Sequence, residues 1–148
     1  MMNASKAKTF CEDRTLHWTT VLNSIWGPVL GDMALIPVPA IKMLSNGSVN
    51  KFGHYRTKDA MCAYNIALCM LQGDAFDETV AHEVAHHVQF IVAKHMGWKT
   101  PFHGELWRTI MASTRFKPRP KAKAHGFPTA VVKAVAQLAR IEFKEGAA

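Results

Sequence analysis

Residues 78–107 read ETVAHEVAHHVQFIVAKHMGWKTPFHGELW, and apolar residues recur at helical spacing through the first part of this stretch. Those positions are Val80, Val84, Val88 and Ile91. Their spacing predicts an amphipathic helix whose apolar stripe faces the core. Acidic residues open the segment and basic residues close it, as a helix dipole favours, so Asp74 is the expected N-cap and Gly97 the expected end.

The middle of this helix carries an H-E-x-x-H pattern, His82-Glu83-Val84-Ala85-His86. Residues four apart lie on one helical face, about 6 Å apart along the axis, so His82 and His86 can reach the same zinc ion. Glu83 projects beside them, where it can take a proton from water that zinc has made more acidic. The pattern therefore predicts a Zn²⁺ site with Glu83 as the general base of a hydrolase.

A catalytic zinc site needs a third protein ligand, and the residues alone leave two candidates open. Both lie beyond the loop that follows the helix: His103 would give a three-histidine site, and Glu105 would replace one histidine with a carboxylate. His87 points about 100° away from His86 around the helix, so we expect it in the core or behind a ligand. Another common zinc-binding pattern, H-E-x-x-H-x-x-G-x-x-H, would place its third ligand at position 92. Val92 stands there, so this pattern is excluded.

The helix pattern and the later stretch His103-Gly104-Glu105-Leu106-Trp107 together resemble the SprT-like metallopeptidases. This family includes the eukaryotic Spartan proteases of DNA–protein crosslinks. Its pattern is an H-E-x-x-H helix, a variable loop, and then H-G-x-x-W/F at the start of the next helix. The resemblance implies that His103 is the third zinc ligand, that Glu105 is not a ligand, and that Trp107 packs under the site.

The resemblance is specific over residues 78–107 and extends more loosely over about residues 9–115. It implies a zincin-like metallopeptidase domain with the H-E-x-x-H helix in its core. Many family members also carry a C-terminal zinc ribbon built from cysteines. The cysteines here, Cys11, Cys62 and Cys69, contain no C-x-x-C pair and cannot form such a ribbon, so the chain resembles a minimal form of the family.

The segments around the central helix predict an α+β class, because a helix and a small sheet come first and further helices follow. Helices are expected over 9–26, 105–114 and 129–144, and strands over 33–38, 41–44, 49–56 and 60–67. Thr9 is the expected cap of the first helix, and residues 45–48 are a turn signal. Prolines at 37 and 39 favour a sheet edge nearby. In the last helix the expected core positions are Val131, Val135, Leu138 and Ile141.

The 148 residues are 49% hydrophobic and 20% charged, which excludes a disordered chain and fits one domain over 1–148. Within it we expect a catalytic core over 9–115, a basic connector over 115–125 and a C-terminal helix over 129–144. The first residues have no apolar segment typical of a secretory signal, and residues 61–71 are too short to span a membrane. We expect a cytoplasmic protein, in the host cytoplasm if a phage encodes it.

The net charge of +7, from 18 basic and 11 acidic residues, is concentrated late in the chain. The densest stretch contains Arg115, Lys117, Arg119, Lys121 and Lys123. Alternating basic residues with interspersed prolines favour an extended chain that can follow a phosphate backbone without reading bases. The stretch therefore predicts contact with DNA that is independent of sequence, although a solubilising connector would have the same composition.

Together these features predict a zinc-dependent endopeptidase acting on DNA-associated or DNA-crosslinked proteins. An edge strand over 60–67 is expected to pair with the extended substrate. Tyr64 is either an aid to the oxyanion or an ordinary core residue. Two alternatives remain: a non-catalytic nucleic-acid-binding module with a structural zinc site, and a regulatory peptidase of the ImmA/IrrE type that cuts one specific partner.

Overall fold

The computed structural model describes residues 1–31, 35–45, 48–122 and 124–146. Its helices are α1 (Ala4–Trp26), α2 (Ile66–Gln72), α3 (Asp77–Met96), α4 (Glu105–Ala112) and α5 (Thr129–Gly146). Short 3-10 turns at Gly27–Leu30 and Gly73–Phe76 follow α1 and precede α3. The strands are β1 (Ala40–Leu44), β2 (Gly53–Arg56) and β3 (Met61–Asn65). The predicted α+β class, with a small mixed sheet packed on helices, is confirmed.

The strands form one mixed sheet in the order β1-β3-β2. β1 runs parallel to β3 and β2 runs antiparallel to it, so β3 is the central strand. The prediction of an edge strand over residues 60–67 is therefore wrong in position and in length. Strand β3 ends at Asn65, whose side chain accepts a hydrogen bond from the Leu68 amide (3.2 Å) and so caps α2. The edges of the sheet are β1 and β2.

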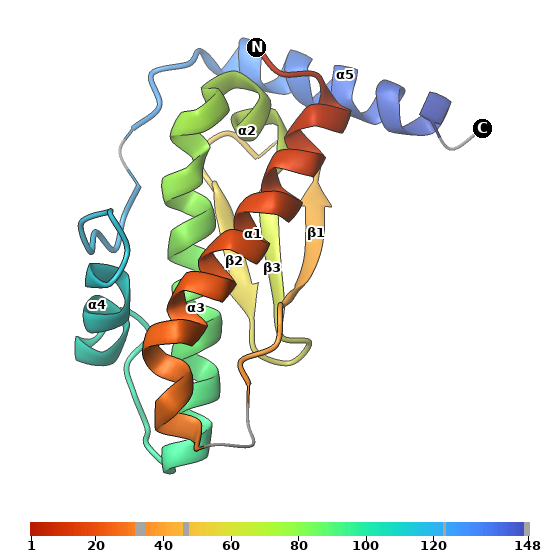
Figure 1. The fold of residues 1–148 in the computed structure, drawn as a ribbon. Helices are drawn as coiled ribbons and strands as arrows, with labels where there is room; N and C mark the ends of the chain where they lie inside the picture. Colours follow the sequence, from red (N-terminus) through yellow and green to blue (C-terminus); the bar gives the residue numbers. More distant parts are fainter. Residues whose placement is uncertain (32–34, 46–47, 123, 147–148) are drawn as a thin grey trace.

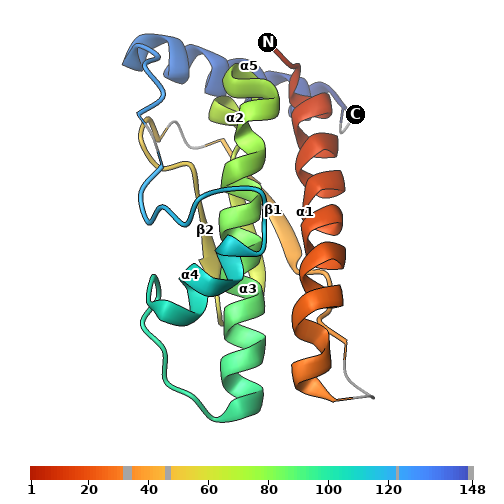
Figure 2. The ribbon, with the colours of Figure 1, turned by 60° about the vertical axis from the view of Figure 1, so that its left-hand side comes forward.

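Helices α1 and α3 lie side by side across one face of the sheet (Figure 1). Helix α4 packs against α3 (Figure 2), and α5 crosses the end of the molecule where α2 lies. Helix α3 therefore has the sheet, α1 and α4 around it. This position explains why Val80, Val84 and Val88 of the predicted stripe are fully buried. Ile91, the fourth predicted member, is only half-buried, and the adjacent Val92 is fully buried instead.

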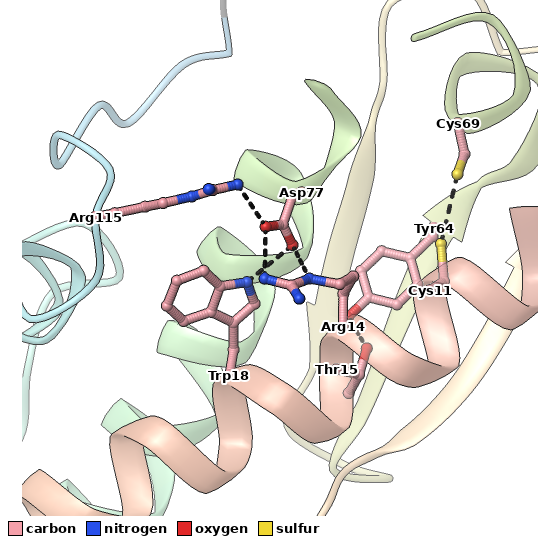
Figure 3. Close-up of polar contacts among 8 residues, drawn as sticks. All are labelled: Cys11, Arg14, Thr15, Trp18, Tyr64, Cys69, Asp77 and Arg115. Atoms are coloured by element: carbon pink, nitrogen blue, oxygen red, sulfur yellow. Dashed lines mark hydrogen bonds and ion pairs between the residues drawn. The ribbon is translucent and has the colours of Figure 1, made fainter. Parts of the chain in front are cut away.

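The sheet face towards these helices is buried, and Tyr64 is part of it. The Tyr64 side chain of β3 is completely buried, and its hydroxyl lies 2.8 Å from the hydroxyl of Thr15 in α1 (Figure 3). Burial raises the pKa of this phenol. Tyr64 is thus a core residue that ties the sheet to α1, and it is not placed to assist an oxyanion.

Two helices begin at different residues from those expected. Helix α1 starts at Ala4, and Asn3 caps it by accepting a hydrogen bond from the Lys6 amide (2.8 Å), so Thr9 lies inside the helix. The Glu142 carboxylate of α5 also accepts a hydrogen bond from the Ala4 amide (2.7 Å). Helix α3 starts at Asp77, because Asp74 belongs to the preceding 3-10 turn.

The end of α3 is the one expected. Gly97 follows the last helical residue with a φ of 70° and a ψ of 24°, the left-handed conformation that glycine adopts without strain. Its amide donates to the carbonyls of Ala93 and Lys94, which satisfies groups that the end of the helix leaves unpaired.

The buried stripe of α5 differs from the predicted one. The buried residues are Val132, Val135, Ala136 and Ala139. Of the four predicted core positions only Val135 is among them, whereas Val131, Leu138 and Ile141 are 40–52% exposed. Small alanines let α5 pack closely on α2, and the larger aliphatic residues remain on its outer face.

The remaining expectations concern loops and the membrane. Two expected elements lie partly outside the described residues: the strand over 33–38 at residues 33 and 34, and the turn over 45–48 at residues 46 and 47. Residues 35–38 are described and form no strand. The strand expected over 49–56 is present only as β2. Among the helices described, none has the length and apolar character that crossing a bilayer requires.

The three cysteines are buried and carry free thiols. The sulfur atoms of Cys11 in α1 and Cys69 in α2 lie 3.7 Å apart (Figure 3), while Cys62 lies in β3. Burial raises the pKa of Cys62, and the contact with Cys69 together with burial raises that of Cys11.

Candidate metal centre and active site

Three histidine side chains meet between α3 and the start of α4. The Nε2 atom of His86 lies 3.3 Å from that of His82 and 3.1 Å from that of His103, and the third side of the triangle measures 3.2 Å. His82 and His86 come from successive turns of α3, and His103 from the loop just before α4. The spacing within the helix and the position of the loop thus bring three imidazole nitrogens to one point.

This triangle fits a tetrahedral zinc ion. Zinc–nitrogen distances of about 2.0–2.1 Å at a tetrahedral angle separate neighbouring nitrogens by about 3.3–3.4 Å, close to the distances between these atoms. Zinc binds neutral imidazole, and burial lowers the pKa of His82 to about 4 and that of His86 to about 3. Burial also lowers the pKa of His103. The donor set is therefore ready for a metal ion near pH 7.

Gln89 orients the ring of His86. The Gln89 amide nitrogen donates to the carbonyl of Pro101 (2.8 Å), so its oxygen is the atom that faces His86 Nδ1, at 3.1 Å. That oxygen can only accept, which places the proton on Nδ1 and leaves the Nε2 lone pair directed into the triangle. Sequence reasoning missed Gln89; its position three residues after a ligand, on the same helical face, is the signal that was available.

Aromatic rings enclose the three histidines. Trp107 is completely buried beneath them, with its ring 4.7 Å from His82 and 4.9 Å from His103, as the family resemblance implied. Its indole nitrogen donates to the carbonyl of His82 (3.4 Å). On the outer side, the Phe102 ring stacks on His86 with the centroids 3.9 Å apart. These contacts limit the rotation of the imidazole rings.

Glu83 lies beside His82 and is 6% exposed. Burial raises the pKa of its carboxyl to about 8, while the charge of Lys51 acts in the opposite direction. The backbone of Gly53 in β2 passes close by: a Cβ atom there would lie 2.6 Å from the carbonyl oxygen of Ala63 and 3.6 Å from the Glu83 side chain. A glycine is therefore needed where β2 runs over the carboxyl group.

Two pockets open on either side of the histidines. The basic pocket, of about 360 Å³, contains His82 and Glu83. Its other lining residues are Asn50, Lys51, Phe52, Gly53, Glu78, Thr79, Met111, Arg119, Pro120, Lys121 and Ala122. The aromatic pocket, of about 240 Å³, contains His86. It is completed by Thr57, Gln89, Phe90, Ala93, Lys94, Trp98, Thr100 and Phe102.

The other candidate ligands lie away from the triangle. Within the described residues, His82, His86 and His103 are the group of potential ligands that lies close enough to hold one metal ion, and Glu105 is exposed outside it. His87 is completely buried. Its Nε2 donates to the carbonyl of Pro37 (2.7 Å), and its Nδ1 accepts from the Tyr55 hydroxyl (2.8 Å). His87 thus has the core position expected for it.

Part of the basic stretch folds back onto α3. We call residues 115–122 the strap. Arg115 binds the Asp77 carboxylate at 2.9 Å (Figure 3), and Arg119 binds the Glu78 carboxylate at 2.7 Å. A hydrogen bond with the Arg119 backbone partly opposes the effect of burial, which lowers the pKa of His82 to about 4. The strap therefore forms one wall of the basic pocket.

The ion pairs change the interpretation of the basic stretch. Of the five residues predicted to contact DNA, Arg115 and Arg119 are engaged within the protein. Lys117 and Lys121 are exposed, and Lys123 lies outside the described residues. The arginines have a structural role that alternation of basic residues did not reveal, because their acidic partners lie far away in the sequence.

Comparison with known proteins gives one family. Residues 40–128 match the sequence profile of the SprT-like family, and this range contains all three histidines, Glu83 and the strap. No curated protein and no solved structure matches the chain.

Proposed function

The chain belongs to the SprT-like family, and from this premise we propose that it is a zinc-dependent endopeptidase. The observation that carries the proposal is the triangle of Nε2 atoms, 3.1–3.3 Å on a side, next to a buried carboxyl group in a pocket. Among the described residues three side chains supply the ligands, which leaves a fourth tetrahedral position for the reaction. A structural zinc site is usually closed by four protein ligands, so this donor set favours catalysis.

His82, His86 and His103 would hold the zinc ion, which supplies a Lewis acid that acidifies water and polarises the carbonyl of a peptide bond. The Glu83 carboxylate takes the proton of the attacking water and passes it to the leaving amine. A nearby positive charge lowers the pKa of a carboxyl group. A bound metal ion would therefore lower the pKa of Glu83 from about 8 towards 7. Such a group can both accept and release a proton near pH 7.

We propose that the substrate pairs with the free edge of β2, which replaces the edge expected at 60–67. Phe52 pairs with Asn65 of β3 through a hydrogen bond of 2.7 Å, and backbone groups of an antiparallel strand alternate between its two sides. The backbone groups of Gly53 and Tyr55 therefore point away from β3. An extended peptide that hydrogen-bonds to them lies directly above Glu83.

We further propose that the substrates are DNA-associated or DNA-crosslinked proteins. The support is the excess of basic residues late in the chain and the exposure of Lys117 and Lys121. Because Arg115 and Arg119 are engaged in ion pairs, the exposed lysines are the residues expected to contact phosphate groups.

The test is cleavage of a basic DNA-binding protein by the purified zinc-loaded chain, with and without single-stranded DNA. We expect Glu83→Gln to retain zinc and lose cleavage by at least about a hundredfold, because the general base is removed. Glu105→Gln is the matched control, since this exposed carboxylate lies outside the histidine triangle. Normal cleavage by Glu83→Gln, or a chain that takes up no zinc, would contradict the proposal. Zinc uptake without cleavage of any protein would favour a structural metal site.

A further inference from the structure

We propose that the site selects peptides with an acidic residue on one side of the scissile bond and a large apolar residue on the other. The inference rests on the proposed peptidase function and names its substrate class. Its basis is the position of the basic pocket and the aromatic pocket on opposite sides of the histidine triangle.

Both pockets are lined by residues of α3 and by residues in or next to β2. On α3, Glu78 to Glu83 line the basic pocket, and His86 to Lys94 line the aromatic pocket. On the strand side, Gly53 at the start of β2 lines the first pocket, and Thr57 just after β2 lines the second. Since α3 rises about 1.5 Å per residue, the two pockets lie roughly 15 Å apart along the helix axis. Four or five residues of an extended peptide span the same distance. A peptide paired with β2 therefore passes both.

The basic pocket carries a net positive charge, because three basic residues line it together with two acidic ones, Glu78 and Glu83. Arg119 is neutralised by Glu78 at 2.7 Å. Lys51 and Lys121 line the same pocket, both are exposed, and in the described part of the chain neither forms a salt bridge with a carboxylate. An acidic side chain placed between them gains favourable electrostatic energy, and a basic side chain is repelled. The chemistry of this pocket thus fits aspartate or glutamate.

The aromatic pocket exposes large apolar surface beside a metal ligand. Trp98 is 50% exposed and Phe102 is 49% exposed, and Phe90 completes the wall. The amino group of Lys94 lies 5.8 Å from the centre of the Phe90 ring. Exposed apolar groups that lie together mark binding sites more often than scattered ones do. Since His86 lines the pocket and Phe102 stacks on it, the expected occupant is the substrate side chain next to the scissile bond.

The experiment measures binding separately from cleavage. Fluorescent peptides of the two sequence orders, acidic residue first or apolar residue first, are titrated into zinc-loaded Glu83→Gln full-length chain. In the order that binds more tightly, we expect replacement of the acidic residue by lysine, or of the apolar residue by serine, to weaken binding about tenfold or more. Cleavage of the same peptides by the wild-type chain tests the proposed peptidase function independently.

Variants of the protein assign each preference to a pocket. We expect Lys51→Gln and Lys121→Gln to abolish the preference for the acidic residue, and Trp98→Ala to abolish the preference for the apolar one. Lys133→Gln and Leu35→Ala are the matched controls, because both residues are exposed and line neither pocket. Equal binding of all peptides, or variants that keep both preferences, would overturn the inference. If no peptide is cleaved although the preferences appear in binding, the selectivity stands and the peptidase function fails.

Discussion

At the scale of single residues, burial moves the acidic and basic groups of the candidate site in opposite directions. The pKa of Glu83 rises to about 8, while those of His82 and His86 fall to about 4 and about 3. In each case the buried environment penalises the charged form. Near pH 7 the metal-free site therefore carries little charge, and a zinc ion would bring both its own charge and the ionisation of Glu83.

The raised pKa of Glu83 gives a pH dependence of stability that a single variant isolates. Between its ordinary pKa of 4.5 and about 8, the folded metal-free protein holds a proton that the unfolded chain has released, so stability decreases as pH rises. Glu83→Gln removes this decrease and leaves the histidines unchanged. In the presence of a chelator, we expect the Tm of the variant relative to wild type to increase by several degrees from pH 5 to pH 8. A difference in Tm that does not vary with pH would contradict the assignment.

At the scale of elements, the first turn of α3 joins three parts of the chain. The buried Asp77 carboxylate accepts hydrogen bonds from Arg14 (2.9 and 3.0 Å) and Trp18 (2.9 Å) of α1 and from Arg115 (2.9 Å) of the strap (Figure 3). A carboxylate at a helix N-terminus is also favoured by the helix dipole. The helix that carries the histidines is thereby fixed to α1 and to the wall of the basic pocket.

We expect Asp77→Ala to lower the free energy of unfolding by about 2 kcal/mol or more, because the indole N–H of Trp18 and the guanidinium of Arg14 lose their shared partner. Denaturant unfolding measures this change. The control is Asp59→Asn, which removes an exposed ion pair with Arg56 and should change stability by less than about 1 kcal/mol. Equal effects of the two variants would show that the Asp77 contacts are not maintained in solution.

The orientation of α5 is tested by two adjacent residues of the same type. Val132 is completely buried and Val131 is 40% exposed. We expect Val132→Ala to lower the free energy of unfolding by about 2 kcal/mol, since it removes buried methyl groups and leaves a cavity. Val131→Ala should change it by about 0.5 kcal/mol or less. A larger loss of stability for Val131→Ala than for Val132→Ala, measured in the same denaturant titrations, would instead support the buried stripe predicted from the sequence.

These elements show which features a sequence reveals. The spacing of His82 and His86 is local, so a helical pattern is sufficient to place them on one face. The central position of β3, the contacts of Asp77 and the hydrogen bond from the Ala4 amide to Glu142 depend on residues far apart in the sequence. In α5, alanines and larger aliphatic residues form two stripes of similar periodicity, and only the packing against α2 decides which one is buried. His103 lay between these cases, because the family resemblance and not its spacing favoured it over Glu105.

At the scale of the whole molecule, the histidine triangle joins α3 to the loop before α4, so a metal ion held there links parts of the chain that unfolding separates. A ligand that binds only the folded state stabilises it by about 2.7 kcal/mol at a free concentration a hundred times the Kd. For a chain of this size that corresponds to a rise in Tm of roughly 5–10 °C.

We therefore expect zinc to raise the Tm of the wild-type chain by about this amount, and His103→Ala to lose most of the increase. His95→Ala is the control, because this exposed histidine of α3 lies outside the triangle. Differential scanning fluorimetry with and without a chelator measures both variants. An undiminished response of His103→Ala to zinc would show that His103 is not a ligand.

The buried cysteines have a practical consequence. Cys11, Cys62 and Cys69 lie in α1, β3 and α2, and each has no exposed surface. An alkylating reagent reaches all three only when these elements separate, so every chain that opens completely gains three labels and every chain that stays closed gains none. Intact-mass spectra recorded during alkylation would thus count the chains that have unfolded, and peptide mapping of any partly labelled species would identify the element that opens first.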